Sequence, residues 1–281
     1  MMEKQQRLVE EHEGFEDRIS RTVLWMSPEI HGRLSQAKLL VVGCGGTGSL
    51  LAVAAAFLGF KSITICDGDT LEASNLNRFV YATPADAGQS KAKLIQSYIK
   101  SHVPEVVVDV LADPFPSQAT LTLVINQPVI VAGCVDDVRV RVELDVMCRR
   151  FGRTLVDLGT GFAVEEDGRI VGSGGQVLIS RPQGPCLMCL GFPQLFNEND
   201  YFAGSDHAPQ PSLLLLNTIV SSLALDCLLK EVSESTPREV NVVRYSRDQM
   251  TLSPERGGRY PSCRICGDFS ASYLRSVLPS D

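Results

Sequence analysis

The chain has 281 residues, of which 44% are hydrophobic and 21% charged, and its formal net charge is −7. That length and composition are typical of a globular protein with a large core in one or two domains. An acidic chain without a basic run argues against nucleic acid as the main partner.

Neither an export signal nor a membrane span is expected. No basic segment followed by an apolar one opens the chain. The most apolar stretch, residues 213–229, is short for a span and contains Asn217 and Asp226, so it predicts a core helix. Nine cysteines, an odd number, favour a reduced cytoplasmic protein that uses cysteine for metal rather than disulfides.

The N-terminal segment is set apart by its charge. Residues 1–17 are highly charged and mainly acidic, and they are typical of a solvated arm or a short helix. Ser27 followed by Pro28 predicts a helix start, with the serine as cap and the proline at the first helical position. We therefore interpret residues 1–30 as an N-terminal arm with a helix.

Apolar strand patterns alternate with helical patterns over the next part of the chain. The expected strands are 38–42, 63–67, 105–111, 129–132 and 154–158, and the expected helices are 50–58, 85–103 and 138–151. Such alternation predicts an α/β fold with a doubly wound, Rossmann-like, mostly parallel sheet.

The pattern changes near residue 162. Glycines interrupt the sequence there, which predicts short antiparallel strands such as 176–180. A proline-rich loop over 181–211, a helix over 213–230 and strands at 239–245 and 250–252 follow. We expect residues 31–281 to form one domain, with a glycine-loop half at about 36–160 and a partly antiparallel half at about 161–281.

A glycine loop follows the first strand. Gly43, Gly45 and Gly48 have the G-x-G-x-x-G spacing, and Gly46 adds a further small residue. The spacing suits a tight turn, a close approach of backbone to phosphate, and a helix N-terminus that favours an anion. Asp67 ends the second strand, where an acid binds ribose hydroxyls in such folds; the alternative is a solvated acid.

Other charged residues lie where they could meet a bound nucleotide. Arg78 and Lys91 could reach a triphosphate, although single basic residues are more often solvated. Asp136 follows a parallel strand at the ligand-binding edge and could hold Mg²⁺, or be a second solvated acid. The next residue, Asp137, is expected to cap a helix.

Two Cys-x-x-Cys pairs predict a structural zinc site. The ligands would be Cys186, Cys189, Cys263 and Cys266. Four thiolates complete a tetrahedral zinc site with no open position, which joins the C-terminal tail to the proline-rich loop. A redox role is less favoured, because neither pair follows a thioredoxin-like strand–helix pattern.

Taken together, these motifs resemble the ThiF/MoeB/HesA family, the bacterial relatives of ubiquitin-activating enzymes. The resemblance runs from about Arg18 to Cys266. The segments that carry it are 18–21, 43–48, 67–69, 74–78, 86–91, 134–137 with Arg141, 175–177 and the two cysteine pairs.

The resemblance implies ATP-dependent adenylation of the C-terminal carboxylate of a protein, typically a ubiquitin-like modifier or sulfur carrier ending in glycine. By matching position, Asp67 would bind ribose, Gly46 would meet the phosphates, and Asp136 would hold magnesium. The phosphates would be held by Asn77, Arg78 and Lys91, with Asp69 and Asn75 at further nucleotide-binding positions. Arg21 would reach the triphosphate from the other subunit of a homodimer.

Three alternatives remain open at this point. The first is adenylation of a peptide or a small carboxylate. The second is an NAD-dependent oxidoreductase, which would use Gly43–Gly48 and Asp67 but leave Arg78, Lys91 and Asp136 without a role. The third is a non-catalytic subunit of a heterodimeric activating enzyme, which the intact set of charged residues argues against.

The chain departs from the family pattern at three places. Asp137 stands where asparagine is usual, and Phe79 stands where glutamine is usual. The segment 190–226, which usually offers an acyl-accepting cysteine, contains none.

Outside the zinc set the cysteines are Cys44, Cys66, Cys134, Cys148 and Cys227, all in apolar or loop-constrained surroundings. We therefore expect no stable thioester on this chain, with the exposure of Cys148 as the open question.

Overall fold

The computed structural model describes residues 16–165, 169–192, 211–233 and 240–267. The strands are β1 Lys38–Val42, β2 Ser62–Cys66, β3 Val107–Leu111, β4 Val129–Gly133, β5 Leu155–Val164, β6 Ile170–Ser180, β7 Val242–Ser246 and β8 Thr251–Glu255. The helices are α2 Glu16–Trp25, α3 Pro28–Gln36, α4 Gly46–Leu58, α5 Lys91–His102, α6 Gln118–Asn126, α7 Val138–Arg150 and α9 Leu214–Ser233. Short 3₁₀ turns are η1 Ala73–Asn75 and η2 Pro84–Asp86.

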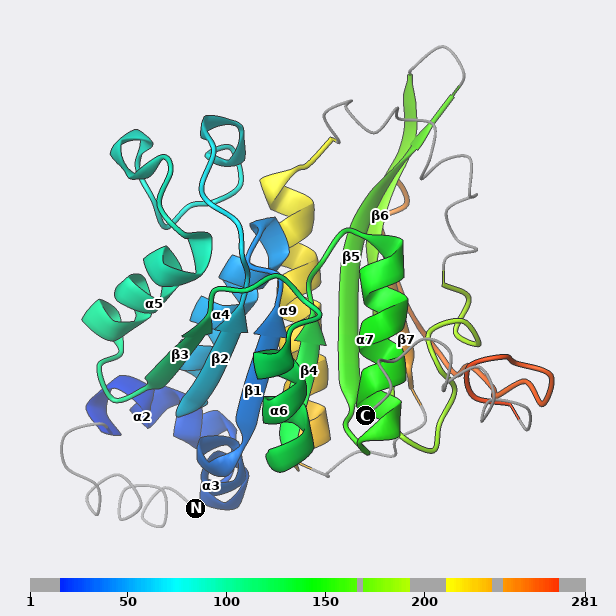
Figure 1. Ribbon diagram of the computed structural model, residues 1–281, viewed down its shortest axis with the longest axis horizontal. Coiled ribbons are helices and arrows are strands. Elements are labelled where there is room, and N and C mark those ends of the chain that lie inside the picture. The colour runs from blue at the N-terminus through cyan, green and yellow to red at the C-terminus, as the bar shows by residue number, and fades with distance from the viewer. Residues whose placement is uncertain (1–15, 166–168, 193–210, 234–239, 268–281) are drawn as a thin grey trace.

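One eight-stranded sheet, in the order β3-β2-β1-β4-β5-β6-β7-β8, runs through the protein (Figure 1). Strands β1 to β5 are parallel, and β6 to β8 continue the sheet in antiparallel pairing. The strand order reverses between β1 and β4. The expected doubly wound parallel sheet with an antiparallel extension is therefore confirmed, and its switch point lies between those two strands.

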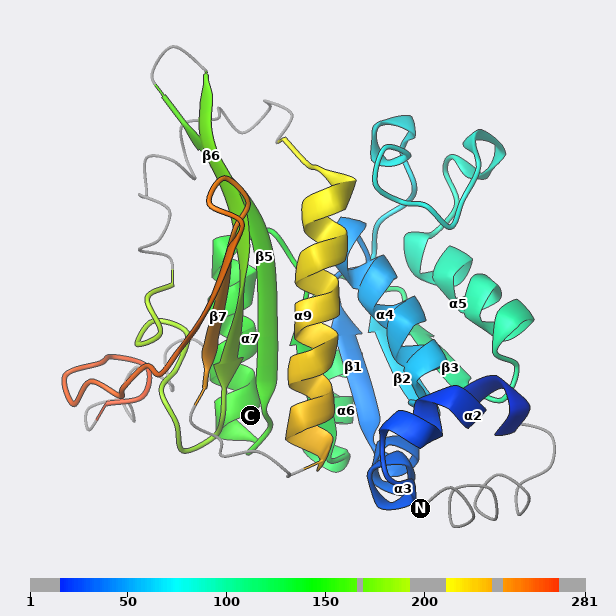
Figure 2. The ribbon, with the colours of Figure 1, turned by 180° about the vertical axis from the view of Figure 1, so that it is seen from behind.

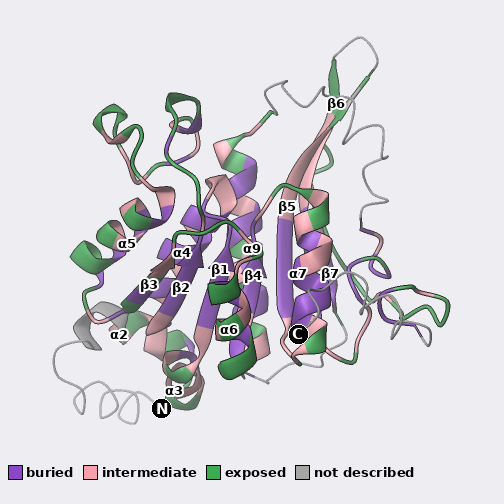
Figure 3. Ribbon diagram, viewed as in Figure 1, coloured by how far each residue is buried: buried purple, intermediate pink, exposed green. Residues whose placement is uncertain are grey.

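Both faces of the sheet are covered, because the central strands are apolar on both sides. Leu39 and Val41 of β1 pack with α3, α4, α5 and α9 on one face. Leu40 and Val42 pack with α6 and α7 on the other. Figure 3 shows the buried residues concentrated in the central strands and the inner sides of the helices.

The turn from β1 into α4 needs glycine at two positions. Gly43 has a φ of +89°, and a Cβ there would lie 2.8 Å from the carbonyl oxygen of Cys134. At Gly48 a Cβ would lie 1.9 Å from the carbonyl oxygen of Gly43. Any larger residue at Gly48 would push the helix away from the strand.

Several expected boundaries were wrong. Helix α5 begins at Lys91 rather than at residue 85, because Ser90 caps it and accepts a hydrogen bond from the Lys93 N–H. The preceding residues form η2 and a turn through Gly88, which has a φ of +87°. Helix α6 was not expected, since its short apolar sequence shows no clear helical period. Strand β6 is continuous rather than a set of short strands.

Helix α9 is the core helix expected from its composition. It runs alongside the strands, next to α4, and packs on β5 and β6 (Figure 2). Within the described part of the chain, no helix is long and apolar enough to cross a membrane. The prediction that Ser27 caps a helix with Pro28 at its first position is confirmed for α3.

An ion pair is buried between α7 and β5. Arg141 Nε donates to Asp157 Oδ1 at 3.0 Å, and Arg141 Nη2 donates to Asp157 Oδ2 at 2.5 Å. The two side chains are 2% and 0% exposed. The ring of Phe192 covers the guanidinium, with 4.1 Å between Cζ and the ring centroid. Burial raises the pKa of Asp157, and the Arg141 guanidinium opposes that shift.

We predict that Asp157→Asn lowers the free energy of unfolding by about 3–5 kcal/mol, because Arg141 is left as an uncompensated buried charge. Urea denaturation followed by circular dichroism would measure the change. The matched control is Asp226→Asn, which breaks the exposed pair with Lys230 on α9. That control should change stability by less than about 0.5 kcal/mol. Equal effects of the two substitutions would contradict the prediction.

Candidate functional site

The predicted nucleotide-binding residues converge at the carboxyl ends of the parallel strands. Gly43 follows β1, Asp67 follows β2 and Asp136 follows β4. Since β1 lies between β2 and β4, these residues occupy one edge at the switch point. Ligands of doubly wound sheets bind at this edge.

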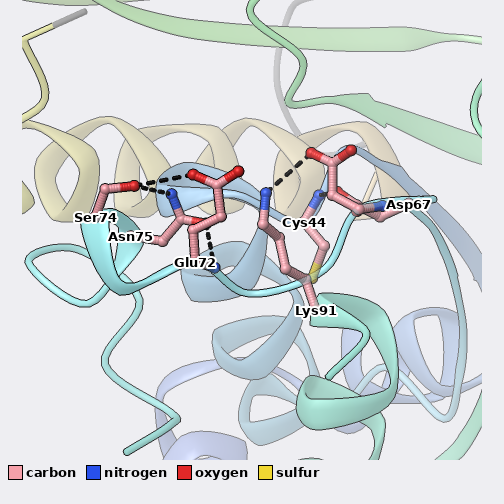
Figure 4. Close-up of polar contacts among 7 residues, drawn as sticks. Cys44, Asp67, Glu72, Ser74, Asn75 and Lys91 are labelled. Atoms are coloured by element: carbon pink, nitrogen blue, oxygen red, sulfur yellow. Dashed lines mark hydrogen bonds and ion pairs between the residues drawn. The ribbon is translucent and has the colours of Figure 1, made fainter. Parts of the chain in front are cut away.

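Asp67 is tied to the glycine loop (Figure 4). Its Oδ2 accepts a hydrogen bond from the Cys44 N–H at 2.5 Å, and its Oδ1 accepts one from the Asp69 N–H at 2.8 Å. Burial raises the pKa of Asp67, and the two N–H groups partly oppose the shift. The carboxylate is therefore held in one orientation beside the loop, where it could receive a hydroxyl donor.

Lys91 is paired with Asp69. Its Nζ lies 2.9 Å from Asp69 Oδ2, and its side chain is 13% exposed whereas that of Asp69 is 73% exposed. The Lys91 N–H also donates to the Asp69 carbonyl at 3.1 Å, so the start of α5 is attached to the segment after β2. The Lys91 charge also lies close enough to Cys44 and Asp67 to oppose the rise in the pKa of each (Figure 4).

Arg78 reaches the glycine loop from the segment after η1. It donates to the Ser74 carbonyl at 3.1 Å and to Asn77 Oδ1 at 3.0 Å. Its Cδ would lie 3.1 Å from a Cβ built on Gly46, so the side chain crosses the start of α4. Asn75, by contrast, is buried and shares a capping box with Glu72 (Figure 4), which gives it a local structural role.

Asn217 was not predicted as a site residue. It is 2% exposed, and a Cβ on Gly46 would lie 2.3 Å from its Nδ2. Its Oδ1 accepts a hydrogen bond from Thr160, and its Nδ2 donates to Ser212. A polar residue in the mainly apolar stretch 213–229 was the signal for Asn217, and it does not indicate which neighbour the side chain contacts.

The glycine loop has the features of a phosphate cradle. A Cβ at Gly45 would meet nothing within 4 Å, so there is space beside the loop. Gly45 caps α4 without a side-chain hydrogen bond, which leaves the first N–H groups of the helix for an anion. The loop therefore fits the phosphates of ATP.

Of the other predicted residues, Asp136 and Asp137 lie at the nucleotide edge, whereas Arg21 does not. Asp136 is exposed at the β4 edge, and Asp137 accepts hydrogen bonds from the Arg139 and Val140 N–H groups, which confirms it as the cap of α7. Arg21 is exposed on α2, at the edge where β1 begins (Figure 1). Within one chain, Arg21 is thus not brought to the glycine loop.

The four paired cysteines form a cluster away from the glycine loop. All four Sγ atoms lie within 4.8 Å of one another. The Cys186–Cys263 and Cys189–Cys266 sulfur pairs are separated by 3.5 and 3.4 Å. This donor set fits a tetrahedral zinc with four thiolates. The buried Asp145 carboxylate of α7 accepts a hydrogen bond from the Leu187 N–H at 2.8 Å. This bond holds the segment that contains Cys186 and Cys189.

The five other cysteines are all buried. Burial is the main cause that raises the pKa of each of their thiols. Cys148 is 0% exposed, which answers the open question from the sequence. A buried thiol with a raised pKa is a poor nucleophile, so none of these five is placed to accept an acyl group.

A glycine loop at the switch point, an acid after the second strand and a separate four-cysteine site define a nucleotide-binding α/β protein. The chain belongs to the ThiF family, whose model matches residues 19–264. It is similar to the molybdopterin-synthase adenylyltransferase of Escherichia coli, with 27% identity over 255 residues that cover 89% of this chain and 96% of that protein.

Two further likenesses extend the comparison. The adenylyltransferase and sulfurtransferase UBA4 of Candida albicans is 28% identical, and the match covers 84% of this chain but only 52% of UBA4. The chain thus spans about half the length of that relative. The crystal structure of Escherichia coli MccB with ATP has a TM-score of 0.70 at 20% identity, covering 89% of this chain and 74% of MccB. This last likeness concerns the fold.

We predict that the purified protein contains about one zinc per chain, as a closed four-thiolate site requires. Cys263→Ser should lower both the zinc content and the melting temperature. Atomic emission and thermal scans would measure them, with Cys227→Ala as a control that keeps its metal. Full zinc retention in the double variant Cys186→Ser/Cys263→Ser would show that these cysteines are not the ligands.

Proposed function

We propose that this protein is an ATP-dependent adenylyltransferase that activates the C-terminal carboxylate of a ubiquitin-like protein ending in glycine. The observation that carries the proposal is the convergence of the glycine loop, Asp67, Arg78, Lys91 and Asp136 at one sheet edge. Family membership and the named adenylyltransferase relatives support it. An oxidoreductase would leave three of those charged residues without a role.

The reaction joins two anions. A carboxylate oxygen attacks the α-phosphorus of ATP in line with the departing pyrophosphate, and the new P–O bond forms as the old one breaks. The protein must therefore position the groups and neutralise their charge. The loop amides and Arg78 would hold the phosphates, and Asp67 would hold the ribose. A magnesium ion at Asp136 would offset further phosphate charge.

Lys91 has a defined starting position for this reaction. Its ion pair with Asp69 holds the ammonium group beside the glycine loop before ATP binds. Because Asp69 is exposed, water can solvate its carboxylate when Lys91 turns to the phosphates. The pair thus positions the cation at low cost.

The proposal includes a homodimer. Helix α2, which carries Arg21, lies at the edge of the sheet where β1 begins, so Arg21 would act on the site of a second copy. In a two-fold dimer each copy would complete the site of the other.

We further propose that the protein acts in the reducing cytoplasm, since four thiolates are needed for zinc.

The direct test is exchange of labelled pyrophosphate into ATP with ubiquitin-like proteins ending in glycine from the source genome. Asp136→Ala and Lys91→Ala should each reduce exchange about 10²-fold, the scale of removing one preorganised electrostatic group. Lys93→Ala, exposed on the same helix, is the matched control. Unchanged exchange in both variants would contradict the roles of Asp136 and Lys91.

A second prediction concerns Arg21. An equal mixture of Arg21→Ala and Asp136→Ala chains should regain activity. About half of the dimers are then mixed, and one of the two sites in each mixed dimer has both residues intact, which is about a quarter of all sites. Each variant alone should be weakly active. If subunit exchange is shown by native mass spectrometry and activity stays low, Arg21 does not act in trans.

A third prediction is that no stable thioester forms on this chain. The five cysteines outside the zinc set are buried, and a thioester needs an exposed, partly ionised thiol. The acyl-adenylate should pass directly to a group on another protein. Mass spectrometry of enzyme, ATP and carrier under non-reducing conditions should show no thiol-labile adduct. An adduct that disappears when one of those five becomes serine would contradict this.

A further inference from the structure

Asn217 on α9 is a buried amide that is hydrogen-bonded at both ends. Its side chain is 2% exposed. Its Oδ1 accepts a hydrogen bond from Thr160 Oγ1 of β5 at 3.2 Å, and its Nδ2 donates to Ser212 Oγ at 3.3 Å. An amide that uses both its acceptor and a donor is held in one orientation, so Asn217 fixes Ser212 relative to the sheet.

Ser212 continues these contacts to Arg78. The Ser212 carbonyl oxygen accepts a hydrogen bond from Asn77 Nδ2 at 3.4 Å, and Asn77 Oδ1 accepts one from Arg78 Nη1 at 3.0 Å. A series of hydrogen bonds thus runs from β5 through the start of α9 to a guanidinium group. We name these five residues the Asn217 network: Thr160, Asn217, Ser212, Asn77 and Arg78.

The Asn217 network lies against the first residue of α4. A Cβ built on Gly46 would lie 2.3 Å from Asn217 Nδ2 and 3.1 Å from Arg78 Cδ, so the two side chains meet at this glycine. One turn further along α9, Ser221 Oγ donates to the Thr47 carbonyl at 2.9 Å. Helix α9 therefore contacts the start of α4 through two successive turns, at the end of the glycine loop that fits phosphates.

These contacts lie on the face of the sheet that α4 and α9 cover. Leu158, two residues before Thr160 on β5, packs in the core with both helices. Residues two apart on a strand share a face, so Thr160 is on that side as well. The Asn217 network is therefore continuous with the glycine loop on one face.

The Asn217 network orients Arg78 without neutralising its charge. The two acceptors that hold the guanidinium, the Ser74 carbonyl and Asn77 Oδ1, are both uncharged. Lys91, another cation at this edge, is instead paired with the Asp69 carboxylate. An arginine that is already held loses less rotamer freedom when an anion binds, so fixing its position increases the affinity for phosphate.

We propose that Asn217 is a positioning residue for the triphosphate of ATP. Through Ser212 and Asn77 it holds the Arg78 guanidinium beside Gly46, where the phosphates bind. This inference rests on the proposed function and adds the residue that keeps one of its cations in place. Because Asn217 is buried, it acts through Arg78 and does not touch the nucleotide.

The test compares the binding of ATP and adenosine by displacement calorimetry, since only ATP has the phosphates that Arg78 holds. Asn217→Ala should raise the Kd of ATP about fivefold, the scale of one neutral hydrogen bond, and change that of adenosine less than about twofold. In the Arg78→Ala background the same substitution should change the Kd of ATP less than about twofold, because its target is already absent. Thr218→Val, exposed on the same turn of α9, is the matched control and should leave both Kd values unchanged.

A second pair of variants keeps the test independent of how well Asn217→Ala folds. Thr160→Val removes the hydroxyl that bonds to Asn217 Oδ1 but keeps the shape of the side chain. It should weaken ATP binding and spare adenosine. Thr160→Ser keeps the hydroxyl and should bind ATP within about twofold of the unsubstituted protein.

Three results would overturn the inference. Equal losses of affinity for ATP and adenosine would show that Asn217 only supports the fold. An undiminished effect in the Arg78→Ala background would show that Asn217 does not act through Arg78. Unchanged ATP binding in both Asn217→Ala and Thr160→Val would show that the network does not position the phosphates. Failure of the unsubstituted protein to bind ATP would instead contradict the proposed function, and the inference with it.

Discussion

The contact between Gly48 and the carbonyl group of Gly43 fixes where helix α4 leaves strand β1. With only hydrogen at the Gly48 α-carbon, the helix starts directly on the end of the strand. Its first N–H groups then point over the sheet edge. The other parts of the site are placed relative to this turn, because Asp67 bonds to the Cys44 N–H and Asn217 packs on Gly46.

Hydrogen bonds connect the glycine loop to the ends of β2 and α5. The Asp67 carboxylate joins the loop to the Asp69 backbone, and the Asp69 carboxylate joins β2 to the start of α5 through Lys91. One chain of contacts thus sets the distance between an acid and a cation that are 24 positions apart in sequence. Asp67 and Asp69 each bond to two residues of this chain of contacts, so the segment between β2 and α5 is held at both ends.

The antiparallel half of the sheet carries the features that stabilise the fold, away from the glycine loop. The Arg141–Asp157 pair and the four-cysteine cluster join α7, β5 and the C-terminal segment. The ion pair is joined by two hydrogen bonds, and the cysteine cluster fits a metal ion.

The sequence by itself determined the glycine loop, the alternating strands, the capped helices at Ser27 and Asp137, and the two cysteine pairs. Each of these depends on spacing within a few residues, and local spacing is visible in the chain. Only the tertiary structure decided the position of Asn217, because its role depends on a helix packed from more than a hundred residues away. The start of α5 and the continuous β6 were likewise decided by competition between caps, turns and pairing partners. Such contacts bring distant residues together, and a short window of sequence does not contain both members.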